Sequence, residues 1–356
     1  MGHSIVAFVI VLGVLIFFHE LGHFLVARFF GVGVETFSLG FGPKVYKIKK
    51  GFTEYCLSII PLGGYVKMVG EEPGVEIKEE DVPISFDHKK LYQKMLIVAA
   101  GPVFNFLLAI LIFYALFQFS GLYLIKPVVG EVTENTPAFA AGIEKGDEIK
   151  GIFGEKIDSW DDMVDLIGAS NGMAVEILIQ RKGSIFPVTL VPEVKKTKNI
   201  FGEDVERYMI GISASGEVFH KSLNPFQAMF AAFEKTWDII ELTVLSVVKM
   251  INGTVSSDNM GGPIMIAQMA GEQAKAGMAN FAFFIAMLSI NLGIINLFPV
   301  PVLDGGHLFF FGIEAVRGKA ASENIREKAN QFGMALLVAL MVFVFYNDII
   351  RMVNGG

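Results

Sequence analysis

Four stretches of this chain are long and apolar enough to cross a lipid bilayer, and this feature limits its fold more than any other. A spanning helix needs about 20 predominantly apolar residues to cross a hydrocarbon core of roughly 30 Å. The stretches lie at Ser4–Phe30, Met95–Ile125, Ala276–Leu303 and Ala329–Asn347, and the second and third contain no charged residue. The sequence therefore predicts a multi-pass α-helical membrane protein with four transmembrane helices.

The composition agrees with this class. Only 18% of the 356 residues are charged and 53% are hydrophobic, whereas average soluble domains carry roughly a quarter charged residues. The net charge of −7 argues against a nucleic-acid-binding protein, which would need a basic surface. A single cysteine, Cys56, excludes an intramolecular disulfide.

A fifth hydrophobic stretch, Phe226–Ile251, has a different pattern. Acidic residues recur along it at helical spacing and lysines flank the same side: Glu234, Asp238, Glu241, Lys235 and Lys249. This pattern is typical of an amphipathic helix that lies in the membrane interface and does not span it.

Lysine and arginine in short loops predict the orientation of the spans, because such loops stay cytoplasmic. Residues 31–94 carry nine lysines, and the segment between the last two spans carries Arg317, Lys319, Arg326 and Lys328. The protein is therefore expected in the cell inner membrane, with both segments on the cytoplasmic side. The N-terminus and the long middle segment are expected outside.

The middle segment, 126–193, has the character of a soluble domain. Short β-like runs at Val128–Val132, Ala174–Gln180 and Phe186–Val191 flank a helical pattern at Trp160–Ile167. The run Thr136–Ile149 resembles the signature of bacterial PDZ domains, whose groove binds an extended peptide as an added strand. The alternative is a small β domain without that groove.

The first span contains the sequence His19-Glu20-Leu21-Gly22-His23. Residues four apart share one face of a helix, so both imidazoles can reach one ion. Zinc accepts two imidazoles and a carboxylate and leaves a fourth position for water, which Glu20 could deprotonate. The alternative, an ordinary solvated helix face, fits poorly here because each ionisable group inside a span costs about 2.5 kcal/mol or more unless it is paired.

The third ligand is expected from another span at matching depth. The third span closes with Asn296-Leu297-Phe298-Pro299-Val300-Pro301-Val302-Leu303-Asp304-Gly305-Gly306-His307. Its two prolines break the helix, and non-helical backbone is tolerated in a membrane where it lines protein or a cavity. Asp304 is the favoured ligand and His307 the competitor, although a histidine at the membrane interface is the simpler explanation of His307.

Together these motifs resemble the site-2 protease family of intramembrane zinc metalloproteases, and most of all its regulator of sigma E protease branch in a single-PDZ form. The resemblance rests on the HELGH span, the sequence Gly101-Pro102-Val103-Phe104-Asn105, the PDZ-like run and the Asn-to-Asp-Gly-Gly stretch, in that order. It implies Zn²⁺ held by His19, His23 and Asp304, with Glu20 as catalytic acid/base and Asn296 at the substrate backbone. The role of Asn105 stays open, with a helix-packing hydrogen bond as the simplest alternative.

Cleavage inside a membrane requires an unwound substrate, because a helix hides its carbonyls in its own hydrogen bonds. Three β-like runs in the first loop, at Lys44–Lys50, Thr53–Ile60 and Tyr65–Val69, could supply an edge strand that pairs with the unwound segment. The resemblance implies a membrane-associated β region here. We expect Tyr65, Val66, Lys67 and Met68 to bind substrate; a plain cytoplasmic hairpin is the alternative.

The sequence thus predicts a protease that cleaves a single-pass membrane protein, such as a pre-trimmed anti-sigma factor, with contacts to lipid and to a peptide at the PDZ groove but none to nucleic acid. A membrane scaffold with a structural zinc site and a zinc transporter are the weaker alternatives. The expected segments are helix 1 (1–30), the β region (31–94), helix 2 (95–125), the PDZ domain (126–193), a post-PDZ region with the interfacial helix (194–275), helix 3 with the Asp motif (276–311), a cytoplasmic loop (312–328) and helix 4 (329–350).

Overall fold

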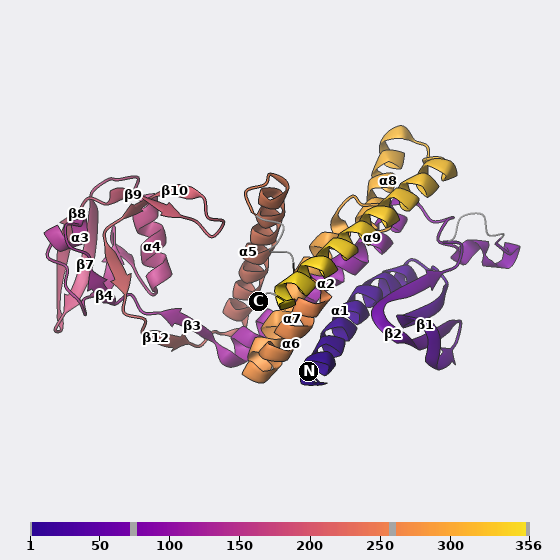
Figure 1. The fold of residues 1–356 in the computed structure, drawn as a ribbon, viewed down its shortest axis with the longest axis horizontal. Helices are drawn as coiled ribbons and strands as arrows, with labels where there is room; N and C mark the ends of the chain where they lie inside the picture. Colours follow the sequence, from indigo (N-terminus) through magenta and orange to yellow (C-terminus); the bar gives the residue numbers. More distant parts are fainter. Residues whose placement is uncertain (1, 72–76, 256–260, 354–356) are drawn as a thin grey trace. The chain divides into compact units, whose positions relative to one another are not determined.

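The computed structural model describes residues 2–71, 77–255 and 261–353. The chain divides into two compact units (Figure 1). The first unit comprises Met1–Leu116, Met229–Val248 and Ser256–Gly356, and the second comprises Phe117–Ala228 and Lys249–Val255. Each is described below by itself.

Long apolar helices dominate the first unit and confirm the four expected from the sequence. They are α1 (Gly2–Phe29), α2 (Leu91–Ser120), α7 (Met278–Leu297) and α9 (Glu323–Val353). Much of their apolar surface is exposed, as it is for a chain solvated by lipid. Val11 and Leu15 of α1 pack with Leu108 of α2 and Ile285 of α7 in a buried cluster, so α1, α2 and α7 share one core.

Two shorter helices complete the bundle, α6 (Pro263–Ala276) and α8 (Asp304–Arg317). The expected segment 276–311 is broken between α7 and α8, as its two prolines predict. Pro299 and Pro301 lie in the break, where a proline ring fixes φ and leaves no N–H for a helical hydrogen bond. A Cβ on Gly305 would lie 2.2 Å from the carbonyl oxygen of Phe298, so only glycine allows this tight return. Asp304 thereby becomes the first residue of α8.

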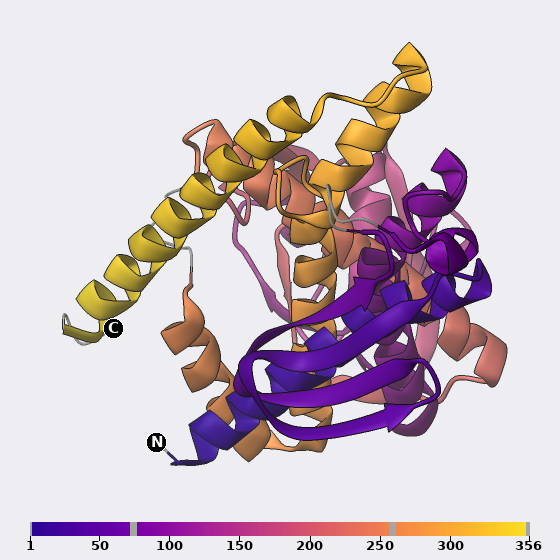
Figure 2. The ribbon, with the colours of Figure 1, turned by 90° about the vertical axis from the view of Figure 1, so that its right-hand side faces the viewer.

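The β region consists of two long strands, β1 (Val34–Lys50) and β2 (Thr53–Met68), that pair antiparallel and lie beside α1 (Figure 2). Both strands bend back, so the N-terminal part of β1, 34–39, pairs on one side with 64–68 and on the other with 54–57. The runs expected at Lys44–Lys50, Thr53–Ile60 and Tyr65–Val69 are thus present, and the sequence interpretation missed the central segment 34–39. Within the described ladder, 64–68 pairs with β1, and the backbone N–H of Met68 donates to Oε2 of Glu71.

A 3₁₀ helix, η1 (Glu79–Ile84), joins this region to α2. Val34 and Phe37 of the sheet pack with Ala27 of α1, Ile97 of α2 and Phe311 of α8 in a second buried cluster. The sheet is therefore tied to the same helices that carry the histidine and aspartate motifs.

The second unit is built around a four-stranded sheet in the order β6-β5-β7-β8, where β5 is Glu148–Ile152, β6 Glu155–Lys156, β7 Val175–Arg181 and β8 Ser184–Leu190. Two helices pack with it, α3 (Pro137–Ala140) and α4 (Trp160–Ala169). A capping box at Ser159 begins α4. Ile149, Ile177 and Met163 are fully buried in its core. The strands and the helix expected in this segment are present.

The expected domain boundary at 193 falls short of the observed unit. The strands β9 (Glu193–Lys198) and β10 (Asp204–Met209) form a hairpin, β11 (Ile212–Ala214) pairs with β4 (Val129–Val132), and β12 (Val218–Lys221) pairs with β3 (Leu122–Ile125). The last two pairings join residues 80 to 99 positions apart, and the local pattern of a sequence carries no sign of such partners. The helix expected at Phe226–Ile251 is α5 (Pro225–Ile251). It is not among the helices apolar enough to span a membrane, and its position in the interface stays a prediction.

Candidate metal centre

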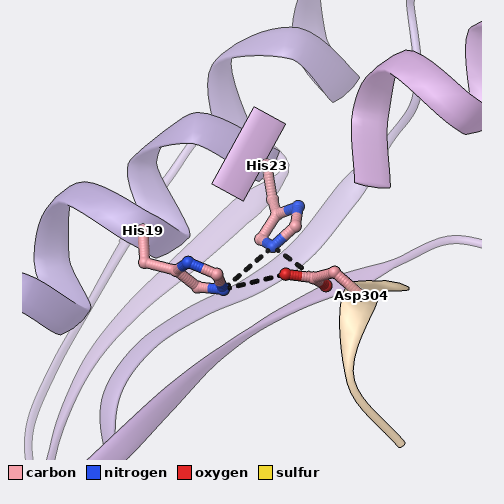
Figure 3. Close-up of side chains that lie close together, drawn as sticks. All are labelled: His19, His23 and Asp304. Carbon is pink, nitrogen blue, oxygen red and sulfur yellow. Dashed lines mark hydrogen bonds and ion pairs between the residues drawn. The ribbon is translucent and has the colours of Figure 1, made fainter. Parts of the chain in front are cut away.

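Helix α1 presents His19 and His23 on one face, one turn apart. Their Nε2 atoms lie 3.3 Å from each other, and the side chains of both residues are mostly buried. The spacing of four residues produces this arrangement directly, because side chains at i and i+4 project from the same side of a helix. Figure 3 shows the two imidazoles converging on a carboxylate.

That carboxylate belongs to Asp304, at the start of α8. Its Oδ2 lies 3.2 Å from Nε2 of His19 and its Oδ1 lies 3.5 Å from Nε2 of His23. The break between α7 and α8 makes this approach possible, since it delivers Asp304 at the first turn of a new helix. Among the described residues, the group that could hold a metal ion consists of His19, His23 and Asp304. His307, the competing ligand, is not part of it.

The donor atoms fit a zinc ion. Tetrahedral zinc with bonds of about 2.0 Å has donor-to-donor edges of roughly 3.3 Å. The two Nε2 atoms lie 3.3 Å apart, and each lies within 3.5 Å of one oxygen of the Asp304 carboxylate, His19 near Oδ2 and His23 near Oδ1. Two imidazoles and one carboxylate are also a donor set that leaves a coordination position open.

Helix α2 closes the opposite side of the histidines. The Nδ1 of His23 lies 2.9 Å from the backbone carbonyl oxygen of Ile97, and the Nδ1 of His19 lies 3.1 Å from the side-chain amide of Asn105. Gly101 leaves space for both rings, because a Cβ there would lie 2.3 Å from Nε2 of His23. The sequence interpretation named the motif from Gly101 to Asn105 without assigning a role to Gly101, and it missed Ile97. The run Gly101–Asn105, which interrupts an apolar helix with glycine, proline and an amide, was the available signal.

Glu20 projects into the same cavity as the two histidines. It is 8% exposed, and no hydrogen bond or ion pair is described for its carboxylate. A carboxyl group beside the metal ligands but outside the ligand group is placed to accept and donate a proton without binding the ion.

The cavity has a volume of about 760 Å³ and is bounded by α1, β2, α8 and the start of α9. Tyr65, Val66 and Met68 of segment 64–68 line it, and their role in binding substrate stays a prediction. Lys67 does not line the cavity; it pairs with Glu35, with Nζ 3.6 Å from Oε2. Asn296 lies in the last turn of α7 and is not among the described residues that line the cavity.

Polar residues of α9 form a wall that the sequence interpretation missed. Arg326, Glu327 and Asn330 line the cavity, and Arg326 pairs with Glu314 of α8, with Nη2 3.5 Å from Oε2. The signal was available in the charged stretch at the start of the fourth apolar segment, which sequence analysis assigned to a loop.

An HExxH pair on one apolar helix, completed by an aspartate from another, defines the class of a membrane-type metallopeptidase. The chain belongs to peptidase family M50, whose family description matches residues 7–340. The resemblance to site-2 proteases is thereby confirmed.

The most similar relatives cover nearly the whole chain. A candidate zinc metalloprotease of Agrobacterium fabrum is 38% identical over 98% of this chain and 96% of its own length. One of Campylobacter jejuni is 37% identical over 98% of this chain and 94% of its own. The regulator of sigma-E protease RseP of Escherichia coli is 33% identical over 98% of this chain and 99% of its own length, in an alignment of 450 positions. Part of that longer relative therefore has no counterpart here.

A solved PDZ domain of an SdrC-like protein from Listeria monocytogenes covers 24% of this chain and 84% of its own, with 23% identity and a TM-score of 0.19. A score this low leaves the PDZ assignment of the second unit a prediction.

Proposed function

We propose that this protein is an intramembrane zinc metalloprotease that hydrolyses a peptide bond within or near the transmembrane segment of a single-pass membrane protein. The observation that carries the proposal is the convergence of His19, His23 and Asp304 at the separations of a zinc site, with Glu20 in the same cavity. Membership of peptidase family M50 and relatives named as zinc metalloproteases support the metal and the reaction.

The residues of the site have two roles, metal binding and proton transfer. His19, His23 and Asp304 hold the ion, and a bound zinc ion supplies a Lewis acid and makes water a stronger acid. Glu20 takes a proton from the attacking water and delivers it to the amine of the leaving peptide. Its burial in the wall of the cavity places this proton transfer away from bulk solvent.

Segment 64–68 binds the substrate by main-chain hydrogen bonds. An unwound substrate segment exposes N–H and C=O groups, and a free strand edge can pair with them. Because side chains alternate across a strand, we expect Val66 and Met68 to contact one side of the substrate and Tyr65 the other. Asn296 is proposed to contact the substrate backbone once a substrate widens the cavity toward the end of α7.

In this proposal the protein lies in the inner membrane with four spanning helices. Residues 31–94 and the metal centre lie toward the cytoplasm, and the N-terminus and the second unit lie outside. The second unit acts as a PDZ module that excludes substrates whose extracytoplasmic domain is untrimmed, such as an intact anti-sigma factor. Its groove binds a peptide or a substrate segment.

The experiment is cleavage of a single-span reporter by the purified, reconstituted protein. Glu20→Gln is expected to keep zinc bound and to abolish cleavage. Asp304→Asn is expected to lower zinc occupancy, and His307→Ala serves as the matched control because His307 lies in the same cavity but outside the ligand group. Cleavage that survives Glu20→Gln or a zinc chelator would contradict the proposal. A larger loss of zinc in His307→Ala than in Asp304→Asn would transfer the third ligand to His307.

The gating part has its own test. Because Leu122 of β3 pairs with Lys221 of β12, the two ends of the stretch 122–221 lie side by side. A short linker from Gly121 to Ser222 can therefore replace this stretch. The shortened protein is expected to cleave an untrimmed substrate that the full chain leaves intact, and unchanged specificity would refute the gate.

A further inference from the structure

The side chain of Asn105 is fully buried against a candidate zinc ligand, and one of its two polar atoms lacks a partner. The amide nitrogen lies 3.1 Å from Nδ1 of His19. The amide oxygen is buried and makes no hydrogen bond with any described residue. A buried acceptor without a partner costs about 1–3 kcal/mol. A donor for this oxygen would remove that cost, and the Nδ1–H of a metal-bound His19 is such a donor.

The position of the ion determines where the protons of the histidines lie. Both Nε2 atoms face Asp304, so the lone pairs at these atoms bind the ion. A neutral imidazole has one N–H, which must then lie on Nδ1. For His23 the neighbour of Nδ1 is the carbonyl oxygen of Ile97, which can only accept a hydrogen bond. Helix α2 therefore favours the metal-binding form of His23.

For His19, the acceptor available at Nδ1 is the side-chain oxygen of Asn105. If the NH₂ group of Asn105 faced the Nδ1–H of His19, two hydrogen-bond donors would face each other. A half-turn of the planar side-chain amide places its oxygen where the nitrogen now lies, with little change in shape. We propose that Asn105 is a positioning residue: its amide oxygen accepts the Nδ1–H of His19 and holds that ring with Nε2 toward Asp304 and His23. This inference rests on the proposed function, because it requires an ion at Nε2.

The surroundings of Asn105 hold its backbone in place. The hydroxyl of Ser289, on α7, donates to the backbone carbonyl oxygen of Asn105 at 2.7 Å. Gly101, one turn earlier on the same face of α2, allows the helix to approach both imidazoles. The motif Gly101–Asn105 thus has two parts with different tasks: the glycine provides space for the rings, and the amide orients one of them.

A role in helix packing alone predicts different behaviour. If Asn105 only fills space, leucine of similar size should replace it without loss of zinc affinity, and a buried aspartate should do harm. If the amide oxygen is the acceptor, aspartate should serve and leucine should fail, because carboxylates are common partners of metal-bound histidines. The conservative variant therefore separates the two roles.

The test measures zinc affinity of the full chain in lipid nanodiscs by competition with a chromophoric chelator, without any assay of cleavage. Asn105→Leu is expected to weaken zinc binding about 10- to 100-fold, and Asn105→Asp is expected to stay close to the wild type. Asn291→Leu is the matched control, the same change in the neighbouring helix α7, where the amide pairs with Thr243 and not with a histidine. It is expected to leave the affinity unchanged.

Equal affinity in wild type and Asn105→Leu would overturn the inference, and so would equal losses in the leucine and aspartate variants. Asn105→Ala, which also lacks an acceptor, replaces the leucine variant if that variant does not fold. A wild-type chain that binds no zinc would instead refute the proposed function, so the two failures are distinguishable.

Discussion

Replacing Gly101 with alanine tests whether the close approach of α2 to the histidines is required for the metal centre. The added Cβ would lie 2.3 Å from Nε2 of His23 and 2.7 Å from Cε1 of His19. Ordinary contacts between such atoms begin near 3.4 Å, so the rings or the helix must move by about 1 Å. Metal sites tolerate deviations of only about 0.2 Å in their ligand distances. The two histidines could then no longer hold their Nε2 atoms at the separations that the ion requires.

We expect Gly101→Ala to weaken zinc binding by about 100-fold or more, which corresponds to roughly 2.7 kcal/mol. The assay is chelator competition on the purified chain, with thermal unfolding of the metal-free protein as a check on folding. Gly13→Ala is the matched control, because no atom lies within 4 Å of a Cβ at that position of α1. Zinc affinity within a few-fold of wild type in Gly101→Ala would refute the reasoning, since it would show that the rings can move aside without losing the ion.

Three further outcomes are expected. Asp348, buried in α9, accepts hydrogen bonds from the backbone N–H groups of Gly262, Ile264 and Met265 at the start of α6. Asp348→Ala should therefore destabilise the start of α6 by about 1–3 kcal/mol. Faster hydrogen exchange of these backbone amides would show the loss. In the second unit, burial raises the pKa of Asp147, but hydrogen bonds from Arg181 and from the Glu144 N–H lower it more, so the pKa lies below its ordinary value. The stability from this pair should be complete above the unfolded pKa of about 3.9 and fall as pH drops through the folded pKa, and Asp147→Asn should remove that dependence in unfolding curves against pH. Arg181→Met, which removes the cation and leaves the buried carboxylate with the Glu144 N–H, should cost about 3–5 kcal/mol and lower the melting temperature of the second unit.

The helices and the ligand set could be predicted from the sequence because their signals are local. Four apolar stretches fix four long helices, and two histidines four residues apart must share a helix face. Asp304 was harder, since it lies 281 positions after His23. It could be chosen because the prolines before it predict a break that brings a polar side chain into an apolar bundle.

Other features could not be predicted because they depend on pairings between distant residues. The central β segment 34–39 pairs with two parts of β2, and β11 and β12 pair with strands about ninety residues earlier. No local alternation of polar and apolar residues indicates which distant edge a strand will join. Lys67 pairs with Glu35 and is not among the described residues that line the cavity, so its contact with substrate stays a prediction.

The arrangement of the centre also explains how the two histidines of α1 can be tolerated in an apolar span. Each such group costs about 2.5 kcal/mol or more in the middle of a bilayer if it lacks a partner. Here the two imidazoles contact one carboxylate through Nε2, and their Nδ1 atoms face a carbonyl oxygen and an amide on α2. Every ring nitrogen thus has a polar neighbour supplied by another helix. The same contacts that reduce the cost of burial also fix the direction of the metal-binding atoms.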